Sequence, residues 1–275
     1  MTLASLIVSV AAYAAGSAAA LRALRAGNPR GLCGARGCAL AGVLSYVAHG
    51  AWEVATAGRL PVADAAEAFA FLSAASVAAA LALDWARGLS ILTVATLPLG
   101  AATSALALAL WASSPPGRPA MPGDAMGTWT VLHVLVALAS YGAFALAFVT
   151  GVVYLVEHRQ LKHHGAGSIL GFLPALETVR RLNVRAMAVG ALLLLAGLLV
   201  GYFQARELYR REFDRLDPKI LLTTLTFLTY AGILLLSARP AFKGRRTALG
   251  SVLGFGLLMI NFWASVFWSD LHRFR

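Results

Sequence analysis

The feature that most constrains this chain is a series of eight apolar blocks, each long enough to cross a lipid bilayer. A transmembrane helix needs about 20 mostly apolar residues. The blocks are continuous rather than alternating, and lipid offers the backbone no hydrogen-bonding partner, so only helices are reasonable. We predict an all-α fold, a polytopic membrane helix bundle in which residues 1–275 form a single integral membrane domain. The expected transmembrane helices cover residues 3–23, 37–56, 65–84, 89–112, 129–156, 185–205, 220–238 and 248–270.

Lysine and arginine are distributed unevenly between the two sets of connections. One set carries the whole formal excess of +11, and the other set is balanced between acids and bases. The positive-inside rule assigns the basic set to the cytoplasm, so both termini are expected on the outer side. The expected location is the bacterial inner (cytoplasmic) membrane, crossed many times. A basic surface against anionic lipids explains the high pI, and no nucleic-acid partner is needed.

Two connections are long. The cytoplasmic one, residues 157–184, is basic, and its histidines His158, His163 and His164 are expected to be solvated loop residues. The outer one, residues 206–219, places Tyr209, Phe213 and Leu216 at helical spacing among charges of both signs. That pattern is typical of a short amphipathic helix lying along a membrane interface.

Two histidines are predicted at the same outer level although they are far apart in sequence. His133 follows Trp129 at the outer start of the fifth span, and His272 follows Trp268 at the outer end of the eighth. Two imidazoles facing each other across an aromatic-lined gap can ligate haem iron on both axial sides. The alternative is that both are ordinary interfacial histidines, since such amphipathic side chains favour this depth.

His49 is predicted deeper, within the outer half of the second span, and Glu67 opens the third span at a similar depth. An ionisable residue inside a span is costly and is by default a candidate functional residue. The two side chains could form a hydrogen-bonded contact that fixes helix packing, or they could contact a ligand that passes through the bundle.

Several stretches in order along the chain carry a family resemblance. They are Pro61 through Glu67 to Phe71-Leu72-Ser73; His133 with Ser140-Tyr141 and Tyr154-Leu155; Leu173-Pro174-Ala175-Leu176-Glu177-Thr178; Asp217-Pro218-Lys219; and Gly254-Phe255 leading to His272-Arg273-Phe274. With these stretches the chain resembles the cytochrome c assembly family of membrane proteins. This family comprises CcsA, the haem-handling subunit of the system II cytochrome c synthase, and HemX-type relatives.

The resemblance implies specific roles. In such proteins two external histidines ligate haem and an intramembrane histidine helps to pass haem outward. Carried over, His133 and His272 match the external pair and His49 matches the intramembrane one. The synthase members also have a tryptophan-rich segment before Asp-Pro-Lys. Here residues 206–216 contain no tryptophan, so this segment departs from the synthase members, in which the tryptophans form the stacking platform for haem and the apocytochrome. The HemX-type branch lacks the same motif.

The leading function is therefore a haem-binding membrane protein that holds or passes non-covalent, b-type haem at the outer face for cytochrome c maturation. Its expected partners are haem, anionic lipids, and a periplasmic cytochrome c assembly protein or apocytochrome c. A HemX-type regulator that docks a haem-biosynthetic enzyme on its basic loop is the first alternative, and a small-molecule transporter is the second. No nucleophile–base pair suggests an enzyme; at most the chain would be a non-hydrolytic subunit of a haem-lyase complex.

Overall fold

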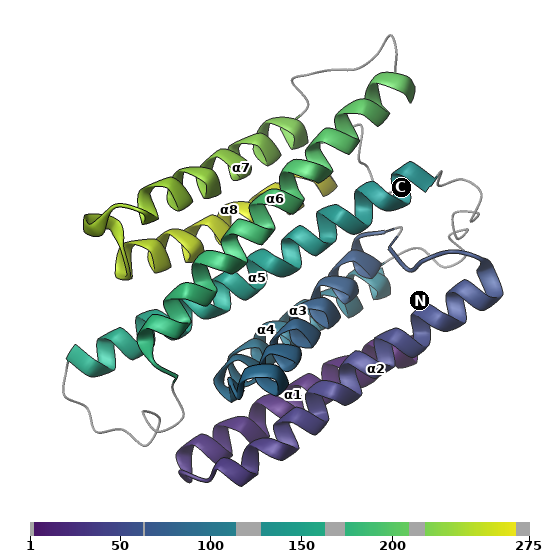
Figure 1. Ribbon diagram of the computed structural model, residues 1–275. Helices are drawn as coiled ribbons and strands as arrows, with labels where there is room; N and C mark the ends of the chain where they lie inside the picture. Colours follow the sequence, from purple (N-terminus) through teal and green to yellow (C-terminus); the bar gives the residue numbers. More distant parts are fainter. Residues whose placement is uncertain (1–2, 63, 114–127, 163–173, 209–217, 268–275) are drawn as a thin grey trace.

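A computed structural model of the chain describes residues 3–62, 64–113, 128–162, 174–208 and 218–267. Every regular element in these ranges is a helix (Figure 1), as the apolar blocks predict. The short 3-10 helices Pro29–Gly31 and Pro240–Phe242 lie between long ones. The long helices are α1 (Leu3–Arg25), α2 (Leu32–Ala57), α3 (Ala65–Arg87), α4 (Ser90–Ser113), α5 (Thr128–Lys162), α6 (Leu176–Leu208), α7 (Pro218–Ser237) and α8 (Arg245–Phe267).

Each of the eight predicted spans coincides with one of these helices. Within the described residues, seven helices are long and apolar enough to cross a membrane, and α2 is the one outside this set. His49 and Glu53 lie inside α2 and lower its mean hydropathy. Its length, 26 residues, is ample for a bilayer of about 30 Å at 1.5 Å per residue.

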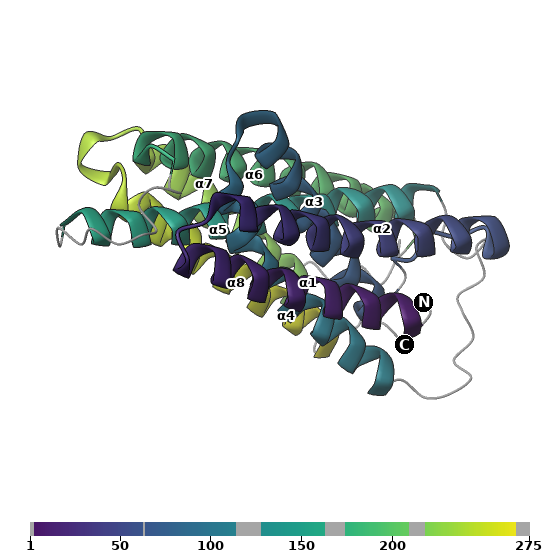
Figure 2. The same cartoon turned by 90° about the horizontal axis from the view of Figure 1, so that it is seen from below.

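The helices run up and down in one bundle (Figures 1 and 2). The α1–α2 pair packs on α3 and α4, and α5 lies between that group and α6, α7 and α8. The first residues of α1 and the last described residues of α8 lie at the same end of the bundle. Glycines allow close approach between neighbouring helices. A Cβ at Gly190 would come within 2.7 Å of the Phe144 ring, and one at Gly254 within 2.9 Å of Tyr230.

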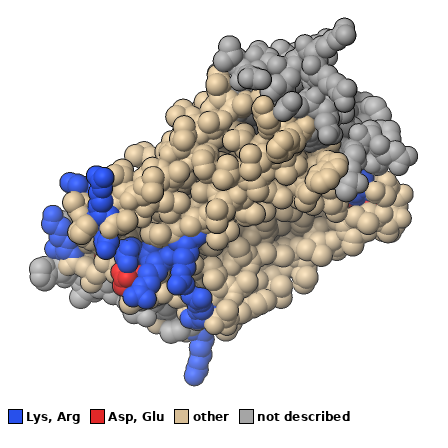
Figure 3. Space-filling view, turned by 45° about the horizontal axis from the view of Figure 1, so that its top comes forward, with Lys and Arg blue, Asp and Glu red and all other residues tan. Residues whose placement is uncertain are grey.

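Most of the lysines and arginines in one view gather at a single end of the molecule (Figure 3). We call this the basic end; it is formed by the α1–α2, α3–α4 and α7–α8 connections, the end of α5 and the start of α6. The charge asymmetry predicted from the sequence is therefore present in three dimensions. The end that carries the start of α5 is called the opposite end.

The expected cytoplasmic connection 157–184 is mostly helix, which corrects the sequence-based boundaries. α5 continues to Lys162 and α6 already begins at Leu176. His158 is thus not a loop residue: it lies on α5, half-buried, with its ring stacked on Tyr154 at a centroid distance of 6.0 Å. His163 and His164, and most of the outer amphipathic segment 206–219, lie outside the described residues.

Candidate functional site

His133 lies in the second turn of α5 and is half-buried against α6. Its Nδ1 atom is 2.9 Å from the carbonyl oxygen of Gly197. Because a carbonyl oxygen only accepts, Nδ1 carries the proton, and the neutral ring keeps its lone pair on Nε2. Metal-ligating histidines almost always donate their other ring N–H to a carbonyl, carboxylate or water, which fixes the ring orientation. His133 therefore has the tautomer in which a histidine binds a metal through Nε2.

Two glycines of α6 contact His133 in different ways: Gly201 forms the surface on which the ring rests, and Gly197 contributes its backbone carbonyl. A Cβ at Gly201 would lie 2.6 Å from Cε1 of His133 and 2.9 Å from Nδ1. No other residue type leaves this space for the ring at its present position. The sequence signal for this contact is the spacing Gly-x-x-x-Gly within an apolar helix, which is typical of close helix–helix contact. Sequence reasoning missed both glycines.

The register of α5 against α8 is fixed by two aromatic pairs. Phe148 stacks on Phe255 with ring centroids 4.8 Å apart, and Tyr141 meets Phe262 edge-on at 6.2 Å. Seven residues separate the two positions on each helix, so the helices are antiparallel and in constant register. The start of α5, with His133, therefore lies at the same end of the bundle as the end of α8.

Aromatic side chains continue across this end of the molecule. Phe69 of α3 contacts Phe262 at 4.4 Å and Trp263 at 5.9 Å between ring centroids, which joins α3 to α8. Trp129, in the first turn of α5, is exposed. The other two predicted site residues, Trp268 and His272, lie outside the described residues.

His49 of α2 is buried, with 5% of its surface exposed. Its Nε2 atom lies 3.8 Å from a carboxylate oxygen of Glu53, one turn further along the helix, and makes no hydrogen bond with the described residues. Buried polar atoms in native proteins normally have a partner, so an unsatisfied one needs an explanation. An imidazole nitrogen of this kind can accept a ligand or a proton.

The carboxylate of Glu67, in the first turn of α3, is held by Arg59, and the carboxylate near His49 Nε2 is that of Glu53. The two terminal guanidinium nitrogens of Arg59, Nη1 and Nη2, donate to the Glu67 carboxylate at 3.1 and 3.0 Å. The same guanidinium lies 3.2 Å from Glu53. The hydrogen bonds to Glu67 raise the pKa of Arg59, which is therefore charged at any physiological pH. One cation thus connects two carboxylates beside His49.

Local geometry brings Arg59 to this position. Gly58 ends α2 in the left-handed conformation, with φ 64°, and turns the chain back toward α3. Asp64 then caps α3 by accepting from the Glu67 backbone N–H at 2.8 Å. Sequence reasoning missed Arg59, whose nearness to Glu67 and Glu53 depends on this turn. We call His49, Glu53, Arg59 and Glu67 the α2–α3 cluster.

The described residues hold no group of three His, Cys, Asp or Glu side chains that could bind a metal ion alone. The α2–α3 cluster and His133 are separate features, because α3 lies between α2 and α5. What they offer chemically is neutral imidazole nitrogen, aromatic surface and one arginine shared by two carboxylates. These groups suit binding and orientation.

Comparison with known proteins adds the family. The family model described as "Cytochrome C assembly protein" matches residues 62–272, which include Glu67, His133 and the position of His272. The match leaves out α1 and α2 and so does not include His49.

Individual relatives agree with this result. Protein HemX of Bacillus subtilis (strain 168) is 27% identical over 236 residues, which cover 83% of this chain and 81% of the relative. Protein HemX of Brevibacillus brevis is 32% identical over 130 residues, 47% of each chain. Cytochrome c biogenesis protein CcsA of Synechococcus sp. (strain CC9902) is 28% identical over 220 residues, 72% of this chain and 71% of the relative. The chain belongs to the cytochrome c assembly protein family.

Proposed function

We propose that the protein binds non-covalent, b-type haem at the opposite end of the bundle, with His133 and His272 as the two axial ligands of the iron. The observation that carries this proposal is the hydrogen bond from His133 Nδ1 to the Gly197 carbonyl. It is the arrangement by which proteins prepare a histidine for metal ligation through Nε2. Bis-imidazole ligation would hold the iron and orient the macrocycle.

The register of α5 and α8 supports the choice of His272 as the second ligand. The described part of α8 ends at Phe267, at the end of the bundle that carries His133. His272 is five residues further along the chain. Trp129 and Trp268, each four residues before its histidine, would flank the macrocycle.

The α2–α3 cluster is proposed as a second contact on the path of haem through the bundle. His49 offers a buried Nε2 atom without a hydrogen bond to the described residues. Beside it lies the ion pair of Arg59 and Glu67. A guanidinium group such as that of Arg59 is suited to bind a propionate carboxylate of haem. Haem would pass His49 before it reaches His133.

The membrane topology proposed with this function has eight transmembrane helices, α2 included, and one membrane-embedded domain. The basic end faces the cytoplasm of a bacterial cell and both termini face outward, as the positive-inside rule requires. The haem site then lies at the outer face of the inner membrane. There the protein would hold or pass haem for cytochrome c maturation, with a periplasmic assembly protein or apocytochrome c as partner.

A second candidate function is a HemX-type accessory or regulatory role in haem biosynthesis. Protein HemX of Bacillus subtilis is matched over most of both chains, and the segment before Asp217-Pro218-Lys219 has no tryptophan. In that case haem acts as the signal, and a haem-biosynthetic enzyme would dock at the basic end. Loss of c-type cytochromes with normal haem synthesis in a deletion strain favours the first function; altered haem precursor levels with intact cytochromes favours the second.

The direct test is a visible spectrum of the detergent-purified protein, oxidised and reduced. A bis-histidine spectrum is expected for the wild type, and His133→Ala and His272→Ala should each shift or abolish it. His158→Ala is the matched control, because this histidine lies on the same helix as His133 but toward the basic end. Equal haem content and identical spectra in all three variants would overturn the proposal.

A further inference from the structure

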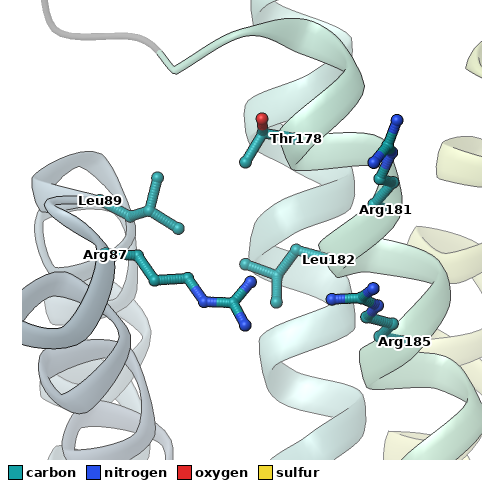
Figure 4. Close-up of a pocket in the computed structure, with 6 residues that line it drawn as sticks. All are labelled: Arg87, Leu89, Thr178, Arg181, Leu182 and Arg185. Atoms are coloured by element: carbon teal, nitrogen blue, oxygen red, sulfur yellow. The ribbon is translucent and has the colours of Figure 1, made fainter.

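A hollow at the basic end lies between the α3–α4 turn and the first turns of α6 (Figure 4). Its volume is about 190 Å³, several times the space of one water molecule in the liquid, which is about 30 Å³. We call it the arginine pocket. It is lined by Arg87, Leu89, Thr178, Arg181, Leu182 and Arg185.

Three of the six lining residues are cationic, and their charges are poorly compensated. Arg181 shares the carboxylate of Glu177 with Arg180, at 2.8 and 2.6 Å. Arg87 and Arg185 form no ion pair or side-chain hydrogen bond with any residue of the described ranges. Figure 4 shows both guanidinium groups pointing into the space between the α3–α4 turn and α6. Like charges that converge repel each other, and an anion between them removes that repulsion.

The residues next to the pocket indicate which kind of anion it binds. Arg181, Arg185, Val189 and Leu192 follow each other at spacings of three and four residues and so share one face of α6. Val189 and Leu192 are exposed, at 51% and 68%. From Arg185 to Leu192 the helix rises about 10 Å. The basic groups at the start of α6 are thus followed, on the same face, by exposed apolar residues further along the helix, away from the basic end.

We propose that the arginine pocket binds the phosphate group of an anionic phospholipid, whose acyl chain lies along Val189 and Leu192. Guanidinium groups bind phosphate oxygens through paired hydrogen bonds. Basic pockets between transmembrane helices on the cytoplasmic side bind anionic head groups in the same way. Leu89 and Leu182 supply apolar contact next to the head group, which a free phosphate ion would not use. The proposal does not depend on haem binding.

The test uses the intact protein in a neutral detergent and native mass spectrometry. The probes are phosphatidylglycerol and phosphatidylcholine with matched acyl chains, and inorganic phosphate. We expect one phosphatidylglycerol to be retained more strongly than phosphatidylcholine. Each of Arg87→Gln and Arg185→Gln should weaken its binding about fivefold, and the double variant about 30-fold. Binding of phosphatidylcholine should not change.

Arg239→Gln is the matched control, because Arg239 is exposed at the same end, between α7 and α8, and does not line the pocket. It should leave phosphatidylglycerol binding within about twofold of the wild type, less than the effect of one pocket arginine. If Arg239→Gln weakens phosphatidylglycerol binding as much as a pocket variant does, the lipid binds to the basic end in general, and the proposal of a specific pocket is wrong. Inorganic phosphate that competes at the same concentration as the lipid would overturn the lipid assignment. Unchanged melting temperatures without lipid verify that all the variants are folded.

Discussion

Two arginine–carboxylate clusters join α2 to α3 at opposite ends of this helix pair. They differ in how many of their polar atoms form hydrogen bonds. At the basic end Arg36 binds Asp84 through two hydrogen bonds, at 2.7 and 2.8 Å. Ser90 and Thr93 donate to the same buried carboxylate, at 3.2 and 3.1 Å. Asp84 thus has four hydrogen bonds from three side chains.

The α2–α3 cluster at the opposite end contains more ionisable groups, but fewer of its polar atoms are hydrogen-bonded among the described residues. Arg59 serves two carboxylates, Glu67 and Glu53, and its Nε atom has no hydrogen bond among the described residues. His49 Nε2 is also unsatisfied there. A fully satisfied buried network rigidifies one structure, whereas buried polar atoms without a partner need an explanation, such as a functional role. From this comparison we expect the Asp84 cluster to contribute mainly stability, and we propose the α2–α3 cluster as a place for binding.

The largest expected effect comes from removing the buried carboxylate at the basic end. Asp84→Ala deletes four hydrogen bonds and should destabilise the protein by about 3 kcal/mol, as for other buried pairs that lose one partner. Thermal unfolding in detergent measures this. Ser90→Ala, which removes one donor, should cost about 1 kcal/mol. Haem content per folded molecule should be unchanged in both; a large loss of haem in folded Asp84→Ala would break the division between the clusters.

An intermediate effect is expected at the His133 contact. Gly201→Ala adds a methyl group where the His133 ring lies, 2.6 Å from Cε1. Overpacking of this kind costs about 1–3 kcal/mol, and the displaced ring should alter the haem spectrum. Gly197→Ala is the control, because its Cβ would meet Ala137 at an ordinary 3.7 Å. If both variants keep the wild-type spectrum, the ring of His133 is not positioned by α6.

The smallest effect on stability is expected at His49. His49→Leu replaces an imidazole whose Nε2 has no hydrogen bond among the described residues, so the unfolding free energy should stay within about 1 kcal/mol. Haem recovered with the protein should fall. Tyr46→Phe provides the comparison: its hydroxyl donates to the Pro61 carbonyl at 3.3 Å next to the same cluster. That variant should lose about 1 kcal/mol of stability and keep its haem. The reverse pattern would make His49 a packing residue.

The fold was largely predictable because long, continuous apolar segments in lipid form α-helices. The eight helices and the basic end follow from hydropathy and from the positions of Arg and Lys. The predicted connection 157–184 was wrong at both ends, since α5 and α6 extend beyond their apolar segments and charged residues are good helix formers outside lipid. Hydropathy marks where lipid ends, not where a helix ends.

The candidate site was less predictable. His133 and His49 stand out in the sequence, because ionisable residues are rare in apolar blocks. The hydrogen bond from His133 to Gly197 depends on how α5 and α6 are rotated against each other. The role of Arg59 depends on the left-handed turn at Gly58. Both are properties of helix packing and loop conformation, which no local pattern specifies.

The ion pairs at both ends of α2 have a consequence for biogenesis. α2 carries Arg36 in its second turn and Glu53 in its second-last turn. A charge at the centre of a span costs about 3 kcal/mol on insertion scales, and one near a helix end costs less but still disfavours insertion. The partners that neutralise these charges, Asp84 and Arg59, come later in the chain and are synthesised afterwards. We therefore expect α2 to enter the membrane as a hairpin with α3, so that the two segments leave the translocation machinery together.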